Sequence, residues 1–173
     1  MKSPFYFLVE PKGERRYSNL SESGLITSVS KEDFKASNRY AVVTAVPNNY
    51  TGPIRPGDEL IVHHNVFKFY NDMKGRERSG WSFIKDNEFM LEPGQFYMYK
   101  RDSKWTCHSK WCFVKPTGDD LRGVIAHIND NLKSMGLSVG DEISFKPDSE
   151  YEFEVDGEKM YRIEDSRITI KWT

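Results

Sequence analysis

Short runs of apolar residues dominate the chain and predict a fold made mostly of β-strands. Two runs, Tyr151–Val155 and residues 167–171, alternate apolar and polar positions with period two, the pattern of half-buried strands. Three others, residues 5–9, 40–46 and 59–62, are dense in aromatic or β-branched residues and are bounded by turn residues. The pattern therefore predicts an all-β protein.

Five short blocks recur in the same order along the chain, which indicates an internal duplication. The blocks pair residues 5–11 with 111–116, 39–47 with 122–128, 56–60 with 139–143, 67–72 with 151–156, and 88–99 with 159–172. One or two such pairs could arise by chance in a β-rich chain, but five in order favour a repeated small β unit. We therefore expect two domains, residues 1–104 and 105–173.

One stretch of the second copy has the spacing of a helix. Apolar residues between Leu121 and Met135 recur every three, four or seven positions, as they would along one helix face. The duplication instead makes residues 122–128 a strand and leaves only a short helical turn over 130–135, ended by Gly136. We favour the strand, and a single helix over 119–135 is the alternative.

The first copy differs from the second in two places. Residues 12–38 connect its first two predicted strands, where the second copy has only residues 117–121. Connections longer than about 12 to 15 residues without structure of their own are usually functional or disordered. A second, polar insertion lies at about residues 73–87 and contains Lys74, Arg76, Arg78 and Lys85. We expect this second insertion to lie on the surface.

Composition excludes several classes of protein. Lys and Arg number 25 against 26 Asp and Glu, so no overall positive field would gather nucleic acid or an anionic membrane. No apolar run approaches the roughly 18 residues that span a bilayer, and the N-terminal apolar run is too short for a signal peptide. Two cysteines are too few for a disulfide framework. We therefore expect a soluble, cytoplasmic protein that binds neither membranes nor nucleic acid.

Residues with metal-binding or catalytic chemistry are sparse. His63 and His64 are adjacent on a predicted strand, so their side chains should point to opposite faces and not share a metal. Cys107, His108 and Cys112 lack the paired spacing of zinc sites. The sequence has no phosphate-binding loop, nucleophile elbow or metalloprotease motif. We expect no enzyme activity, no metal and no cofactor.

Residues 99–111 interleave cations with aromatic rings, a composition found in proteins that bind single-stranded nucleic acid. A linker between domains would show the same composition if Lys and Arg side chains lay over the rings. We favour the linker interpretation, with nucleic-acid binding as the alternative.

The order of elements resembles the GroES-type co-chaperonins. The first copy matches in its opening strand and in the string Glu22-Ser23-Gly24-Leu25-Ile26 within the long connection, which is similar to the mobile loops of bacteriophage members. Both copies match in a Gly-Asp turn, at Gly57-Asp58 and Gly140-Asp141. The resemblance implies two tandem GroES-like small β-barrels, with a mobile loop at about residues 12–38 in the first only.

The resemblance also implies a function. A co-chaperonin caps an ATP-bound group I chaperonin ring and assists protein folding, and here Ser23, Gly24, Leu25, Ile26 and Thr27 would contact the ring. Burial of Leu25 and Ile26 would contribute roughly 1.5 to 3 kcal/mol each, so several copies in a homo-oligomer would be needed for tight binding. The alternative is a viral structural or virion component that reuses the barrels as a packing module.

Overall fold

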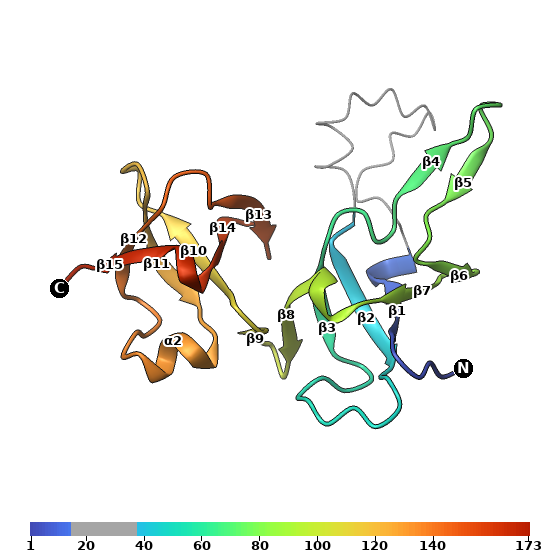
Figure 1. Ribbon diagram of the computed structural model, residues 1–173, viewed down its shortest axis with the longest axis horizontal. Helices are drawn as coiled ribbons and strands as arrows, with labels where there is room; N and C mark the ends of the chain where they lie inside the picture. Colours follow the sequence, from blue (N-terminus) through green and yellow to red (C-terminus); the bar gives the residue numbers. More distant parts are fainter. Residues whose placement is uncertain (15–37) are drawn as a thin grey trace. The chain divides into compact units, whose positions relative to one another are not determined.

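The computed structural model describes residues 1–14 and 38–173, and these residues are mostly β-strand (Figure 1). They form two compact units, Met1–Arg101 and Asp102–Thr173. Every pair of strands within them is antiparallel. The prediction of an all-β fold is therefore confirmed.

The described residues contain no helix long and apolar enough to cross a membrane.

The first unit is built on six strands in the spatial order β6-β7-β1-β2-β3-β8. They are β1 (Phe7–Pro11), β2 (Tyr40–Ala45), β3 (Glu59–Val62), β6 (Phe83–Lys85), β7 (Glu88–Leu91) and β8 (Phe96–Arg101). A separate two-stranded hairpin consists of β4 (Phe69–Asn71) and β5 (Glu77–Ser79). Two short 3-10 turns, η1 (Lys12–Glu14) and η2 (Pro93–Gln95), follow β1 and precede β8.

The second unit repeats this order as β13-β14-β10-β11-β12-β15. Its strands are β9 (Lys104–Cys107), β10 (Trp111–Pro116), β11 (Arg122–His127), β12 (Glu142–Phe145), β13 (Tyr151–Val155), β14 (Glu158–Glu164) and β15 (Ile168–Lys171). It also contains the helix α2 (Asp130–Ser134) and the turn η3 (Asp165–Arg167). Within the described residues neither strand order closes on itself; β6 is an edge strand of the first sheet, and β13 and β15 are the edge strands of the second.

The two units also share the register of their strand pairs. The pairing of β1 with β2 shifts between Leu8 and Val9, and the pairing of β10 with β11 shifts between Phe113 and Val114. A second shift occurs within β3 against β8, and again within β12 against β15. Each shift is a β-bulge, an extra residue that bends its strand. Matching bulges at matching positions show that the sequence repeat is a structural repeat.

One block of the predicted repeat was paired wrongly. Residues 67–72 were matched to 151–156, but the strand that occupies the place of β13 in the first unit is β6. Residues 69–71 belong instead to the extra hairpin, which has no counterpart in the second unit. The apolar alternation of residues 67–72 is that of a two-stranded hairpin, and such a hairpin has the same period as a core strand.

The stretch with helical spacing forms a strand followed by a short helix, as we predicted. Residues 122–127 are β11, and α2 is five residues long. The side chain of Asn129 caps the helix by accepting a hydrogen bond from the Leu132 backbone N–H at 2.8 Å. Gly136, with φ of 85°, ends it, since a left-handed conformation suits glycine. A helix over 119–135 is excluded.

The two Gly-Asp turns have the same structural role in both units. Gly57 and Gly140 have φ of 92° and 93°, which allow the tight turn before β3 and β12. Asp58 then accepts a hydrogen bond from the Arg55 N–H, and Asp141 accepts one from the Ser138 N–H, each at 2.8 Å.

A cation from the last strand of each unit completes this arrangement. Arg101 donates to both carboxylate oxygens of the buried Asp58, at 2.9 and 2.6 Å. Lys171 lies 2.8 Å from Asp141. The motif that carried part of the sequence resemblance therefore fixes a turn and ties it to the last strand.

The pair formed by Asp141 and Lys171 should make stability depend on pH. The hydrogen bond from Lys171 holds the pKa of Asp141 below its usual value. A lowered pKa in the folded state means that the ionised carboxylate stabilises the fold above the ordinary Asp pKa of about 4, and that this stabilisation is lost as the pH falls through the folded-state value. We expect the free energy of unfolding to fall more steeply for the wild type than for Asp141→Asn between about pH 5 and about pH 2. Urea denaturation at each pH measures this, with the exposed Asp120→Asn as control, and equal slopes for wild type and Asp141→Asn would contradict the expectation.

Candidate functional site

The five predicted partner-binding residues, Ser23, Gly24, Leu25, Ile26 and Thr27, lie outside the described residues. They fall in the segment 15–37, between η1 and β2. The structure does describe the residues on which both ends of this segment are fixed. These residues form the base of the candidate site.

Asn38 holds the two ends of the segment together. Its side chain is buried, and its amide nitrogen donates a hydrogen bond to the carbonyl oxygen of Lys12 at 3.0 Å. Its amide oxygen accepts a hydrogen bond from the Tyr40 N–H at 2.9 Å. The side chain of Asn38 thus joins the residue that follows β1 to the first residue of β2.

Further contacts tie the base to the sheet. The Lys12 ammonium lies 2.8 Å from the Glu59 carboxylate and 5.8 Å from the centre of the Tyr40 ring. The carbonyl of Arg39 accepts a hydrogen bond from the Val62 N–H at 2.8 Å. The described residues on either side of the segment therefore lie close together at the first sheet, even though 28 residues separate Pro11 from Tyr40.

The corresponding connection of the second unit cannot present a segment. Only residues 117–121 separate β10 from β11. Gly118 and Leu121 both have positive φ, and Leu121 packs on the core of its unit. The connection is therefore a tight turn with no spare length.

The second unit has a groove that the sequence did not indicate. It has a volume of about 370 Å³, and an adjoining hollow of about 380 Å³ shares part of its lining. Apolar lining comes from Val124, Ala126, Val139, Val155 and Met160. Because these residues come from several separate segments, no local motif could have revealed the groove.

The polar groups of this groove are largely occupied by one another. The indole N–H of Trp105 donates to Asp156 at 2.8 Å, and Lys115 lies 2.5 Å from Glu158. Burial lowers the pKa of His127, so its imidazole is neutral at physiological pH. The groove thus combines an apolar wall with one ion pair and one hydrogen-bonded carboxylate.

The stretch 99–111 places its cations against its rings. Trp105 is buried, with 7% of its surface exposed. The cations of Lys110 and Arg162 lie 5.1 and 4.4 Å from the centre of the Trp111 ring. Arg101 lies 5.8 Å from the Tyr99 ring. Lys110 and Arg101 thus lie over rings of the same stretch, as the linker interpretation expects, but most of the stretch is strand, since β8 ends at Arg101 and β9 covers Lys104–Cys107.

The cysteines and adjacent histidines do not assemble a metal site. Cys107 and Cys112 are buried thiols, and burial raises the pKa of Cys112 to about 12. The rings of His63 and His64 stack with centroids 4.2 Å apart. The expectation that they point to opposite faces was wrong, because β3 ends at Val62 and strand alternation stops there. No group of three or more His, Cys, Asp or Glu side chains that could hold a metal occurs in the described part of the chain.

Comparison with known proteins does not add a family. No protein-family model matches the chain, and no curated protein matches it. Function is therefore inferred from the residues and their geometry.

Substitution of Asn38 should weaken the base of the segment. Asn38→Ala removes both amide hydrogen bonds and leaves the Lys12 carbonyl and the Tyr40 N–H without that partner. We expect a loss of about 1 to 3 kcal/mol in the free energy of unfolding, measured by urea denaturation. Asn48→Ala, at an exposed turn of the same unit, is the matched control and should change little. Equal effects of the two substitutions would show that Asn38 does not hold the base.

Proposed function

We propose that the chain is a co-chaperonin that caps an ATP-bound group I chaperonin ring through the residues around Leu25 and Ile26. The observation that carries this proposal is the contrast between the two units. They share strand order and register, but only the first has a long connection, which contains Gly24-Leu25-Ile26 and is fixed at its base by Asn38.

A segment fixed at both ends suits repeated capping. A segment that becomes ordered only on binding loses entropy at that moment, so its affinity is modest and its release is easy. In this proposal the fixed base would keep Leu25 and Ile26 near the ring once one copy has bound, which would raise their effective concentration there. Several copies in a homo-oligomer would together give tight binding that a change in the ring could reverse.

The proposal includes two GroES-like barrels as the scaffold. The two units share an order of six antiparallel strands and two bulges at matching positions. Bulges bend strands and are common at the rims of barrels, which favours a strongly curved sheet. The second unit, which lacks the long connection, would serve as a structural extension of the cap.

In this proposal the chain needs no catalytic group or cofactor, since the chaperonin hydrolyses ATP. The chain would act in the cytoplasm of the cell that supplies the ring. In the groove of the second unit, Lys115 is paired with Glu158 and Asp156 accepts a hydrogen bond from Trp105, which fits a structural role for that unit.

Co-sedimentation with a bacterial double-ring chaperonin tests the proposal. We expect the wild-type chain to sediment with the ring in the presence of ATP and to stay in the supernatant without it. The double variant Leu25→Asp, Ile26→Asp should lose this binding by at least about tenfold, because two charged side chains cannot be buried in an apolar contact.

The matched control introduces the same charges elsewhere in the segment. The double variant Leu20→Asp, Val29→Asp should sediment like the wild type. If the wild type does not bind with or without ATP, the chaperonin proposal fails and the structural or virion component becomes the better hypothesis. Equal loss in both double variants would show that Leu25 and Ile26 have no specific role.

A further inference from the structure

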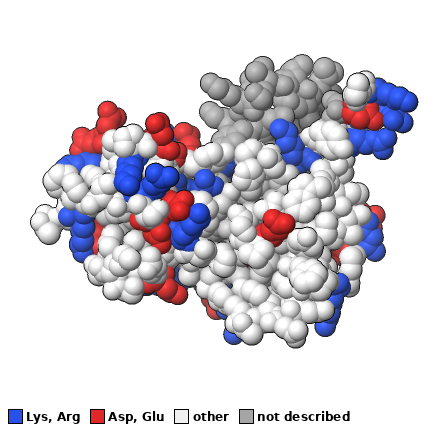
Figure 2. Space-filling view, viewed as in Figure 1, with Lys and Arg blue, Asp and Glu red and all other residues white. Residues whose placement is uncertain are grey.

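The extra hairpin of the first unit, β4–β5, carries a compact group of cations. Lys74, Arg76 and Arg78 lie around one carboxylate, that of Asp72, at and beside its turn. Figure 2 shows this group as blue side chains around a single red patch. The hairpin is absent from the second unit, so the repeated fold does not require it.

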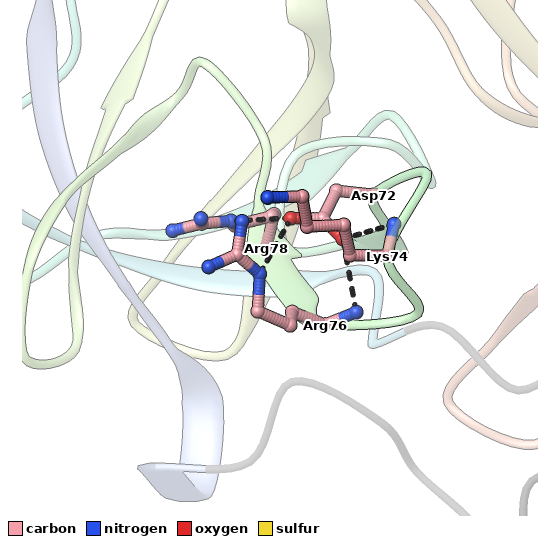
Figure 3. Close-up of polar contacts among 4 residues, drawn as sticks. All are labelled: Asp72, Lys74, Arg76 and Arg78. Carbon is pink, nitrogen blue, oxygen red and sulfur yellow. Dashed lines mark hydrogen bonds and ion pairs between the residues drawn. The ribbon is translucent and has the colours of Figure 1, made fainter.

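Asp72 orients the backbone and both arginines (Figure 3). One carboxylate oxygen accepts hydrogen bonds from the N–H groups of Lys74 and Arg76 at 2.9 and 3.0 Å. The other oxygen accepts from the Nε atoms of Arg76 and Arg78 at 3.1 and 3.2 Å. These hydrogen bonds, the one from the Arg76 backbone first, lower the pKa of Asp72. The arginines are thus held in place before any partner binds.

The arginines keep part of their binding capacity for a partner. Their side chains are 59% and 50% exposed, and the contacts with Asp72 use only the Nε atoms. The hydrogen bonds described for the two guanidinium groups use Nε and leave Nη at the exposed end. Two oriented guanidinium groups with open Nη edges match carboxylates, which can accept two hydrogen bonds from each.

The residues around the cations favour a protein partner over nucleic acid. Met73, Tyr70 and Trp81 are all exposed, and Tyr70 lies directly opposite Arg78 in the hairpin. Met, Tyr, Trp and Arg are the residues enriched at protein interfaces. Binding to nucleic acid normally uses more phosphate contacts than three cations can make, and the chain as a whole has a net charge of -1. The hairpin therefore suits an acidic protein segment.

The second unit contains a strand whose charge is opposite to that of the hairpin and whose charged residues have the same two-residue spacing. Every second residue from 148 to 158 is acidic, and no cation occurs in this stretch: Asp148, Glu150, Glu152, Glu154, Asp156, Glu158. Its centre is β13, an edge strand, in which Phe153 and Val155 are buried while Glu152 and Glu154 are exposed. Lys159 lies 3.6 Å from Glu152, and more than half of each side chain is exposed, so this ion pair is weak and exchangeable.

We propose that the β4–β5 hairpin of one copy binds the β13 edge of a second copy, with Arg76 and Arg78 against Glu152 and Glu154. The spacing fits, because each pair is separated by two positions, and Glu152 and Glu154 lie about 6.5 Å apart along β13. Pairing of the two edge strands would bring the side chains to cross-strand distance. The contact joins different surfaces on the two copies, so it can continue into a ring or a chain of copies. It does not depend on the proposed co-chaperonin function.

Sedimentation velocity of the full chain tests this contact by charge reversal. We expect oligomers at about 50 mM salt that dissociate at about 500 mM, since screening weakens exposed ion pairs. Arg76→Glu, Arg78→Glu and, separately, Glu152→Arg, Glu154→Arg should each weaken association by about tenfold or more. An equimolar mixture of these two double variants should associate again, because each copy then supplies the charge that the other lacks.

Matched controls separate this contact from general charge effects. Arg55→Glu, Lys85→Glu changes the charge of the same unit by the same amount at exposed positions and should associate like the wild type. Thermal unfolding checks that every variant is folded. A wild type that is monomeric at both salt concentrations would overturn the proposal, and so would oligomers that persist in both double variants. Failure of the mixture to associate would also overturn it, because the hairpin and β13 would then bind different partners.

Discussion

A hydrogen-bonded strand pair with a β-bulge lies at the centre of each unit, and the other strands are arranged on both sides of it. β1 buries three consecutive residues, Phe7, Leu8 and Val9, and its pairing with β2 shifts between the second and the third. β10 buries three consecutive residues in the same way, with the shift again between the second and the third. Because side chains alternate across a strand, three consecutive buried residues mean that both faces of β1 and of β10 are covered. β1 lies between β7 and β2, and β10 lies between β14 and β11, so the connection that follows each strand begins at the same place in its unit.

Much of this arrangement could be predicted because the repeat was visible in short apolar blocks. The repeat correctly predicted that residues 122–127 form a strand, although their spacing is helical. A whole repeated unit constrains secondary structure more than local periodicity does. It failed at residues 67–72, where an inserted hairpin has the same alternation as the strand it was matched to. The side chains of His63 and His64 were wrongly predicted to point to opposite faces, because no local sequence signal marks the end of β3 at Val62. The groove of the second unit depends on contacts between distant segments, which no short motif encodes.

The features that suggest interactions are divided between the two copies of the repeat. The first unit carries the long connection fixed by Asn38 and the hairpin organised by Asp72, and neither has a counterpart in the second. The second unit instead has an acidic edge strand and a tight turn where the connection would be. Duplication of a stable unit allows one copy to acquire such insertions while the shared register keeps both folded. Surface connections tolerate added length well, because the entropy of loop closure rises slowly with length.

The most direct test exchanges the connection between the two copies. Residues 12–39 would be replaced by the five residues of the second unit's turn, Thr-Gly-Asp-Asp-Leu, and binding to an ATP-loaded chaperonin ring would be measured by interferometry. The account predicts that the shortened chain still unfolds cooperatively, because β1 and β2 retain their register, but that ring binding is lost. Retained binding would contradict a functional role for the connection, and a chain that no longer folds would contradict the equivalence of the two units.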